Sequence, residues 1–133
     1  MKKITYLLIG ILCLTSCSSN DDDVSDPIIG KWKIKSGTVN NISILNACSS
    51  QTSIEFKSDN TVNVVSFSDD NANSNCTSEL QTGNWKLNNG SSYATTLDSN
   101  NGSFIDANII FSDNNNTFTT GPSSNVVLIY TKI

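Results

Sequence analysis

The feature that most limits the fold of this chain is a two-residue alternation of apolar and polar side chains in short runs. The strictest run is Lys31-Trp32-Lys33-Ile34-Lys35, in which the lysines flank Trp32 and Ile34. A period of two with one charged face is typical of a half-buried β-strand. Since no window has the 3.6-residue period of an amphipathic helix, we expect an all-β domain.

Turn-forming residues separate these runs. Asn, Ser, Asp and Gly gather in clusters such as Asn71–Asn75 and Ser112–Asn116, and these residue types favour turns because they bond their own backbone or tolerate positive φ. Segment 38–50 fits a short strand and an ordered loop equally well. Strands are expected at residues 31–35, 53–57, 61–67, 79–87, 93–97, 104–111, 117–120 and 126–130. Roughly seven to nine short strands predict a β-sandwich or a β-barrel.

The N-terminus has the layout of an export signal. Met1-Lys2-Lys3 precedes the apolar run Ile4–Leu14, which is roughly half of the ~20 residues that a membrane-spanning helix needs. The sequence Leu14-Thr15-Ser16-Cys17 resembles the bacterial lipobox, which implies cleavage before Cys17 and lipidation of its thiol. The alternative is an ordinary cleaved signal. Residues 1–16 are therefore predicted to be a lipoprotein signal peptide.

Residues 17–27 are predicted to be a lipidated acidic tether. The polar, acidic stretch Ser18–Pro27 cannot bury apolar surface, so it should stay solvated. It resembles the acidic export signal of surface-exposed lipoproteins of the Bacteroidota. This resemblance implies attachment to the cell outer membrane through the lipid on Cys17, with the protein facing outward. Several acyl chains would make such an anchor stable.

The remaining composition fits one small domain at residues 28–133. Removal of residues 1–16 leaves 117 residues with six Lys, twelve Asp and Glu, no Arg and no His, and a net charge of −6. A core of modest size is expected for this length. Nucleic-acid binding is not expected, because there is no basic patch to neutralise phosphates. We expect a monomer.

Two cysteines, Cys48 and Cys76, lie in the predicted domain at residues 28–133. Outside the cytoplasm an isolated pair is expected to form a disulfide. Two free thiols or half of a metal site are the alternatives. A bond would close a 29-residue segment, for which loop entropy predicts about 3–4 kcal/mol of stabilisation.

The sequence has no pattern that predicts catalysis. It lacks the imidazole base and the Gly-x-Ser-x-Gly turn of common hydrolases. Its carboxylates fall mainly in expected turns and in the tether, where Asp serves the backbone. We therefore expect no catalytic residue, no metal site and no cofactor, and the protein is not expected to be an enzyme.

A family resemblance narrows the fold. Gly30-Lys31-Trp32 matches the Gly-x-Trp signature of lipocalins, and a second Gly-x-Trp occurs at Gly83–Trp85. Together with the lipobox, the tether, the positions of the two cysteines and the terminal strand Val127–Tyr130, this layout resembles the lipocalin-like lipoproteins of the Bacteroidota. The resemblance implies a small antiparallel up-and-down β-barrel of about eight short strands, with Gly30 and Trp32 in the core that closes one end.

The chain departs from the lipocalin pattern in two ways. Lipocalins pair this Trp with an Arg near the last strand, whereas this chain has no Arg and offers only Lys132. We therefore expect Trp32 to pack on aliphatic neighbours and on the stem of Lys132. The domain is also shorter than an ordinary lipocalin, so its interior is either a small cavity or filled by side chains.

Two functions follow from these two outcomes. The first is binding of a small apolar ligand in the barrel, with Phe56, Val64, Trp85 and Phe111 as candidate cavity-lining residues. The second is a packed-barrel scaffold that mediates protein or glycan interaction at the cell surface. A cavity of at least ~300 Å³ favours the first. A filled interior with an exposed apolar patch favours the second.

Overall fold

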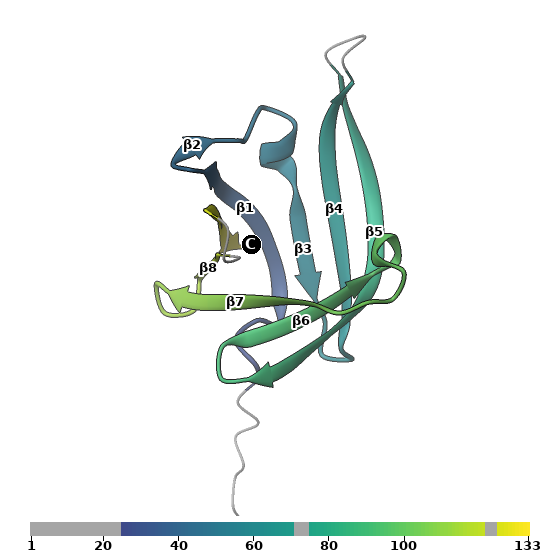
Figure 1. Ribbon diagram of the computed structural model, residues 1–133, viewed down its shortest axis with the longest axis vertical. Coiled ribbons are helices and arrows are strands. Elements are labelled where there is room, and N and C mark those ends of the chain that lie inside the picture. The colour runs from purple at the N-terminus through teal and green to yellow at the C-terminus, as the bar shows by residue number, and fades with distance from the viewer. Residues whose placement is uncertain (1–24, 71–74, 122–124) are drawn as a thin grey trace, which may run out of the picture.

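The computed structural model describes residues 25–70, 75–121 and 125–133 (Figure 1). These residues form one antiparallel sheet of nine strands, which closes where β1 (Gly30–Val39) pairs with β9 (Val126–Lys132). The others are β2 (Ile42–Ser43), β3 (Ser53–Phe56), β4 (Thr61–Asp70), β5 (Asn75–Asn89), β6 (Ser92–Leu97), β7 (Ile105–Ser112) and β8 (Thr117–Thr120). β2 only extends β1, so the barrel has eight strands joined in chain order. This confirms the predicted up-and-down β-barrel.

The predicted signal peptide and the lipidation site lie outside the described residues. Residues 1–16, Cys17 and the tether up to residue 24 therefore stay predictions. Segment 38–50, for which the sequence left two interpretations open, combines both. β1 continues through Val39, the two-residue strand β2 follows, and a loop leads to the single-turn helix η1 (Ser49–Gln51).

Asparagine makes the sharp reversals between strands, as its turn chemistry predicts. Asn60, between β3 and β4, has a φ of +66°, a left-handed conformation that Asn tolerates better than most residues. Beside it, the Asp59 carboxylate accepts hydrogen bonds from the Thr61 hydroxyl at 2.6 Å and the Thr61 amide at 3.0 Å. These bonds lower the pKa of the Asp59 carboxyl. The turn is thus fixed by local side-chain bonds.

β5 is longer than the sequence predicted. It begins at Asn75 and not at Glu79, so that Cys76 lies in a strand and not in the expected polar loop. β4 and β5 pair over ten positions, and their upper part rises beyond the other strands (Figure 1). The polar sequence predicts a loop here, but a two-stranded ribbon exposes both faces and forms without apolar alternation.

The Cys48–Cys76 disulfide fastens this ribbon to the barrel, which confirms the predicted bond. Cys48 is buried and sits in a turn that Asn46 stabilises, because the Asn46 Oδ1 atom accepts hydrogen bonds from the amides of Cys48 and Ser49 at 2.9 and 2.8 Å. Cys76 is exposed on the ribbon. The bond therefore connects a rigid turn to a strand that packing alone would leave unsupported.

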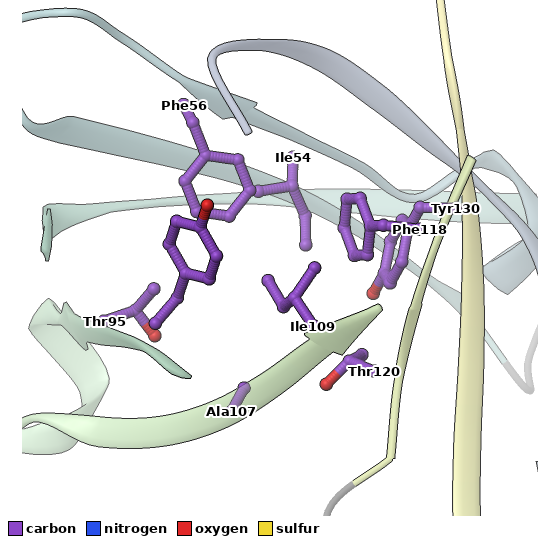
Figure 2. A pocket seen from close by; sticks show the side chains of 9 residues that line it. Ile54, Phe56, Thr95, Ala107, Ile109, Phe118, Thr120 and Tyr130 are labelled. Atoms are coloured by element: carbon purple, nitrogen blue, oxygen red, sulfur yellow. The ribbon is translucent and has the colours of Figure 1, made fainter. Parts of the chain in front are cut away.

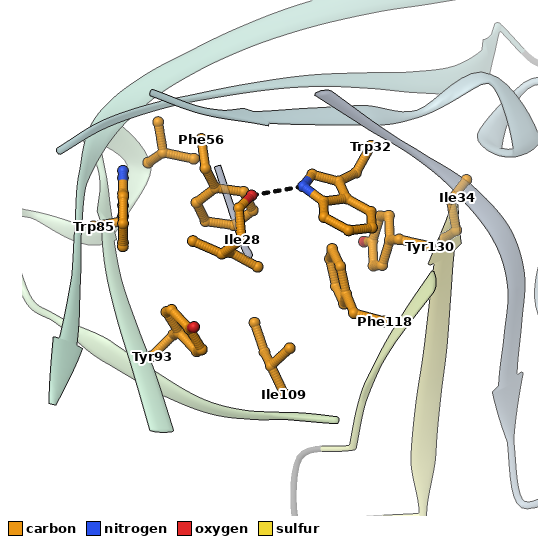
Figure 3. Close-up of a cluster of buried hydrophobic side chains, with 10 residues drawn as sticks. Ile28, Trp32, Ile34, Phe56, Trp85, Tyr93, Ile109, Phe118 and Tyr130 are labelled. Carbon is orange, nitrogen blue, oxygen red and sulfur yellow. Dashed lines mark hydrogen bonds between the residues drawn. The ribbon is translucent and has the colours of Figure 1, made fainter. Parts of the chain in front are cut away.

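The end of the barrel where the chain enters is closed by residues Asp26–Ile28, which we term the plug. The Trp32 Nε1 atom in β1 donates to the Ile28 carbonyl at 2.7 Å, and the Tyr93 hydroxyl in β6 donates to the Asp26 Oδ1 atom at 2.7 Å. β1 and β6 stand on opposite sides of the eight-strand ring. The plug therefore crosses the barrel, and the Ile28 side chain is fully buried inside it (Figure 3).

A continuous set of aromatic contacts surrounds Ile28 and forms the floor of the barrel. The Trp32 ring meets Phe118 edge to face with centroids 4.7 Å apart, and Phe118 stacks on Tyr130 at 4.8 Å. Further ring contacts connect Phe111, Tyr93, Trp85 and Phe56. The expectation that Trp32 packs mainly on aliphatic residues is therefore wrong. Inward positions on β7 and β8 carry Phe, and aromatic pairs in these geometries are favourable.

Lys132 takes the place beside Trp32 that the lipocalin pattern gives to Arg. Its Nζ atom lies 5.1 Å from the Trp32 ring centroid, within cation–π range, and donates to the Pro27 carbonyl at 3.4 Å. Its stem crosses Gly30, where a Cβ atom would lie 2.7 Å from Lys132 Cε. Gly30 also has a φ of +135°. A side chain at residue 30 would therefore strain the backbone and displace the end of the Lys132 side chain.

The second Gly-x-Trp plays a similar structural part in β5. A Cβ atom at Gly83 would collide with the backbone carbonyl of Thr96 in β6, so glycine lets the two strands approach. Trp85 is buried, and its Nε1 atom donates to the Lys57 carbonyl at 2.9 Å. Both tryptophans thus satisfy their one donor on backbone near the floor, as buried indoles require.

We expect Trp32→Ala to lower the free energy of unfolding by about 3–5 kcal/mol, because it removes a fully buried ring and leaves the Ile28 carbonyl without its donor. Urea denaturation would measure the change. Lys33→Ala, on the exposed face of the same strand, serves as the control and should alter stability by at most about 0.5 kcal/mol. An unchanged melting temperature for Trp32→Ala would contradict this role.

Candidate functional site

A cavity of about 110 Å³ lies in the barrel interior against the aromatic floor (Figure 2). Its walls come from five of the strands. The lining side chains are Ile54 and Phe56 of β3, Tyr93 and Thr95 of β6, Ala107 and Ile109 of β7, Phe118 and Thr120 of β8, and Tyr130 of β9. None of these nine side chains carries a charge, so the cavity is an apolar space with a few hydroxyl groups.

Strand periodicity explains why these residues meet. Four strands each contribute two lining residues separated by one position, which is the spacing that places side chains on the same face of a strand. Register then aligns them, since Tyr93 pairs with Ala107 and Ile109 pairs with Thr120 across neighbouring strands. The space exists because three of these inward positions hold only a methyl group or a threonine, namely Thr95, Ala107 and Thr120.

Both tyrosines of the cavity wall are neutral at physiological pH. Burial, then the hydrogen bond to Asp26 and its negative charge, raise the pKa of the Tyr93 hydroxyl above its usual value. Burial alone raises the pKa of the Tyr130 hydroxyl to about 12. The site therefore offers hydroxyl donors and acceptors in an apolar setting and no fixed charge.

The size of the cavity limits what it can hold. Ordinary pockets for drug-sized ligands measure roughly 300–1,000 Å³, so 110 Å³ is well below that range. An apolar protein cavity of about 150 Å³ accommodates benzene. The space therefore fits one small ring, a short chain, or the end of a longer molecule that reaches in from the end opposite the floor.

Of the four residues predicted to line a cavity, Phe56 lines this one and the other three lie elsewhere in the core. Trp85 and Phe111 belong to the floor, where both contact Tyr93, while Val64 is half-buried and packs against the core. Their contact with a ligand stays a prediction.

Sequence reasoning missed the residues that dominate the wall. They are the paired inward positions of β6 and β8, whose sequences Tyr93-Ala94-Thr95 and Phe118-Thr119-Thr120 show no clear alternation of apolar and polar residues. Alternation alone cannot reveal the inward face of a strand whose two faces are both weakly polar. Tyr130 was missed for another reason, because the run Val126–Tyr130 is apolar on both faces.

A second hollow lies on the outer wall between β1 and β9, beside the bulge that separates Ile34 from Ser36 in the pairing register. Its lining includes the exposed Lys33 and Lys35, and its volume is about 360 Å³. The hollow is shallow and open to solvent.

Within residues 25–70, 75–121 and 125–133, no group of three or more His, Cys, Asp or Glu residues could hold a metal ion. No helix in this part of the chain is long and apolar enough to cross a membrane.

Comparison with known proteins identifies the family. The lipocalin-like domain family matches residues 28–120, which include Ile28 of the plug, the floor residues other than Tyr130, and β1 to β8. The chain belongs to the lipocalin-like family. This confirms the resemblance seen in the sequence. The match to the family ends at residue 120, before β9, which is the strand that closes the barrel and carries Tyr130.

The fold is also similar to a crystal structure of a lipocalin-like protein from Bacteroides uniformis. The TM-score is 0.57 at 12% sequence identity, over 81% of this chain and 100% of that chain. At this identity the similarity supports the shared fold alone. A comparison with curated proteins found no match.

We expect the protein to lose stability as pH rises from about 10 to 12. Because the pKa of Tyr130 is raised above its unfolded value of about 10, the native state favours the neutral hydroxyl. The stability that this preference contributes is fully present below pH 10 and is lost as the pH rises through about 12. The loss from this residue is about 3 kcal/mol. Urea unfolding at a series of pH values would measure it.

Tyr130→Phe should flatten this pH dependence, because the variant has no hydroxyl to ionise. All other side chains are the same in the parent and the variant. The difference between the two curves therefore isolates Tyr130. Identical slopes for the two proteins would show that the hydroxyl is not shielded from water in the native state.

Proposed function

We propose that this lipocalin-like protein binds a small apolar molecule, or the apolar end of a longer one, inside its barrel. The observation that carries the proposal is an uncharged cavity of about 110 Å³ enclosed by the walls of a closed barrel. Apolar cavities of this kind stay dry and gain by accepting an apolar guest. The fold and the family both support a ligand-binding scaffold.

The plug determines the end of the barrel from which a ligand can enter. It seals the end of the barrel where the chain enters, through bonds to both β1 and β6. A ligand therefore enters from the opposite end, where β2 and the upper part of the β4–β5 ribbon lie (Figure 1). A molecule that fills 110 Å³ has only a few non-hydrogen atoms. Since each contributes at most about 1.5 kcal/mol, weak and reversible binding is expected.

Ala107→Phe should abolish binding of a small apolar probe such as toluene, because the new ring occupies the cavity that Ala107 leaves open. NMR titration of the full-length chain with toluene would measure the affinity. Asn108→Phe provides a matched control, since Asn108 neighbours Ala107 in β7 but is exposed on the outer face. This control should bind toluene as the parent does. Equal binding by both variants would place the probe outside the barrel.

A second function has specific support. The interior is largely filled by aromatic side chains, and Ile42 and Ile44 are exposed near the end of β1, with 71% and 47% of their surface accessible. A packed scaffold that binds a partner protein or a glycan at the cell surface would have these features. Failure of the parent protein to bind any small apolar probe would favour this alternative.

We also propose that a lipid on Cys17 anchors the protein to the cell outer membrane, with the barrel at the cell surface. The support is the lipobox-like sequence before Cys17 and the acidic tether after it. Ser25 lies beside the plug, and the eight residues from Cys17 can reach at most about 29 Å. In this arrangement the floor faces the bilayer, and the open end of the barrel faces away from it.

Cys17→Ala should move the protein from the membrane fraction to the soluble fraction, because the thiol that would carry the lipid is gone. Cys13→Ala is the matched control, since Cys13 lies within the predicted signal peptide, and it should leave the protein in the membrane fraction. Protease treatment of intact cells should degrade the anchored protein. Retention of Cys17→Ala in membranes, or protection from protease in intact cells, would contradict the anchor or its outward orientation, respectively.

A further inference from the structure

Tyr130 presents an unused hydroxyl to the cavity. The side chain is only 5% exposed and its ring stacks on Phe118. Figure 2 shows its oxygen turned toward the side where Ile109 and Thr120 lie. No hydrogen bond to this oxygen occurs among the described residues, in which no fully buried side-chain oxygen or nitrogen lacks a partner. The Tyr130 hydroxyl therefore keeps access to open space, and the space it lines is the cavity.

The other tyrosine of the wall is already engaged. The Tyr93 hydroxyl donates to the Asp26 carboxylate at 2.7 Å and so holds the plug in place. Because its proton is used in this bond, the Tyr93 hydroxyl cannot donate to a ligand. Of the two tyrosines, Tyr130 is therefore the one whose hydroxyl is free both to donate and to accept a hydrogen bond with a bound molecule, at the edge of an otherwise apolar space.

The surroundings of the cavity disfavour a charged ligand. No lysine is among the lining residues, so a carboxylate in the cavity would have no counter-ion. The charged group that bonds directly to a lining residue is the Asp26 carboxylate, which is negative, whereas the Lys132 ammonium lies against the Trp32 ring and the Pro27 carbonyl. Burial of an unpaired charge in such a space is strongly unfavourable, whereas a neutral polar group needs only one hydrogen-bond partner.

We propose that the barrel selects neutral molecules that combine a small apolar body with one hydrogen-bonding group, such as a hydroxyl or a carbonyl, and that Tyr130 recognises that group. This inference rests on the proposed ligand-binding function and specifies its ligand class. It also assigns specificity to β9, which lies beyond the part of the chain that matches the family.

Phenol and toluene are suitable probes because they differ by one hydroxyl in place of one methyl group at nearly equal size. Each would be titrated by NMR into the full-length chain, into Tyr130→Phe and into Thr131→Val. The measured quantity is the ratio of the phenol affinity to the toluene affinity, which cancels differences in overall stability. Thr131→Val is the matched control, because Thr131 neighbours Tyr130 in β9 but lines the hollow on the outer wall, so this variant removes a hydroxyl that lies outside the cavity.

Tyr130→Phe should shift the affinity ratio toward toluene by about threefold to tenfold, as expected for the loss of one hydrogen bond. Thr131→Val should leave the ratio within about twofold of the parent. In the parent protein, NOEs between bound phenol and the Tyr130 ring provide a second measurement that does not depend on a variant. Benzoate, which has a similar ring but carries a negative charge, should bind at least tenfold more weakly than phenol.

The outcomes separate this inference from the function on which it rests. If toluene and phenol both bind but Tyr130→Phe leaves their ratio unchanged, the role of Tyr130 is overturned while ligand binding stands. Equal binding of benzoate and phenol would overturn the selection for neutral molecules. If neither toluene nor phenol binds the parent, the ligand-binding function itself fails, and this inference fails with it.

Discussion

The hydrogen bond from the Trp32 indole to the Ile28 carbonyl is the interaction on which the closed end of the barrel depends. It turns the chain that precedes β1 back across the barrel, where Asp26 meets Tyr93 on the opposite wall. Ile28 is thereby buried among aromatic rings, and its own amide is satisfied by the Asp26 carboxylate at 3.0 Å. Without this crossing, the aromatic floor would face water, and the cavity above it would be an open channel.

The side chains that stabilise the barrel and the cavity proposed to bind a ligand share the same small interior. Eight short strands enclose little volume, and the aromatic floor uses most of it. What remains is about 110 Å³, kept open by small side chains on β6, β7 and β8. Larger residues at these positions would improve packing and remove the site, whereas smaller residues in the floor would enlarge the site and weaken the core. The ligand class is therefore set by the residue sizes on three strands.

Much of this architecture could be predicted from the sequence, because it depends on local patterns. Alternation located eight strands, and asparagine-rich turns separated them. The cavity could not be predicted in the same way, since strand tilt and register decide which inward residues meet. Phe56 was found because its strand alternates clearly, while Tyr130 was hidden in a run that is apolar on both faces. The first four residues of β5 were missed because disulfide bonding and pairing with β4 support a stretch that has no apolar face.

Closure of the barrel joins the two ends of the folded domain, with consequences for when folding can finish. β1 pairs with β9 over seven positions, and Lys132 reaches Pro27, which lies 105 residues earlier in the chain. Contacts at such separation form late, because the whole chain must first be brought together. Until β9 arrives, β1 and β8 are open edges that can pair with other chains. A chain truncated before residue 126 would thus keep its hairpins, but its sheet would stay open and prone to aggregation.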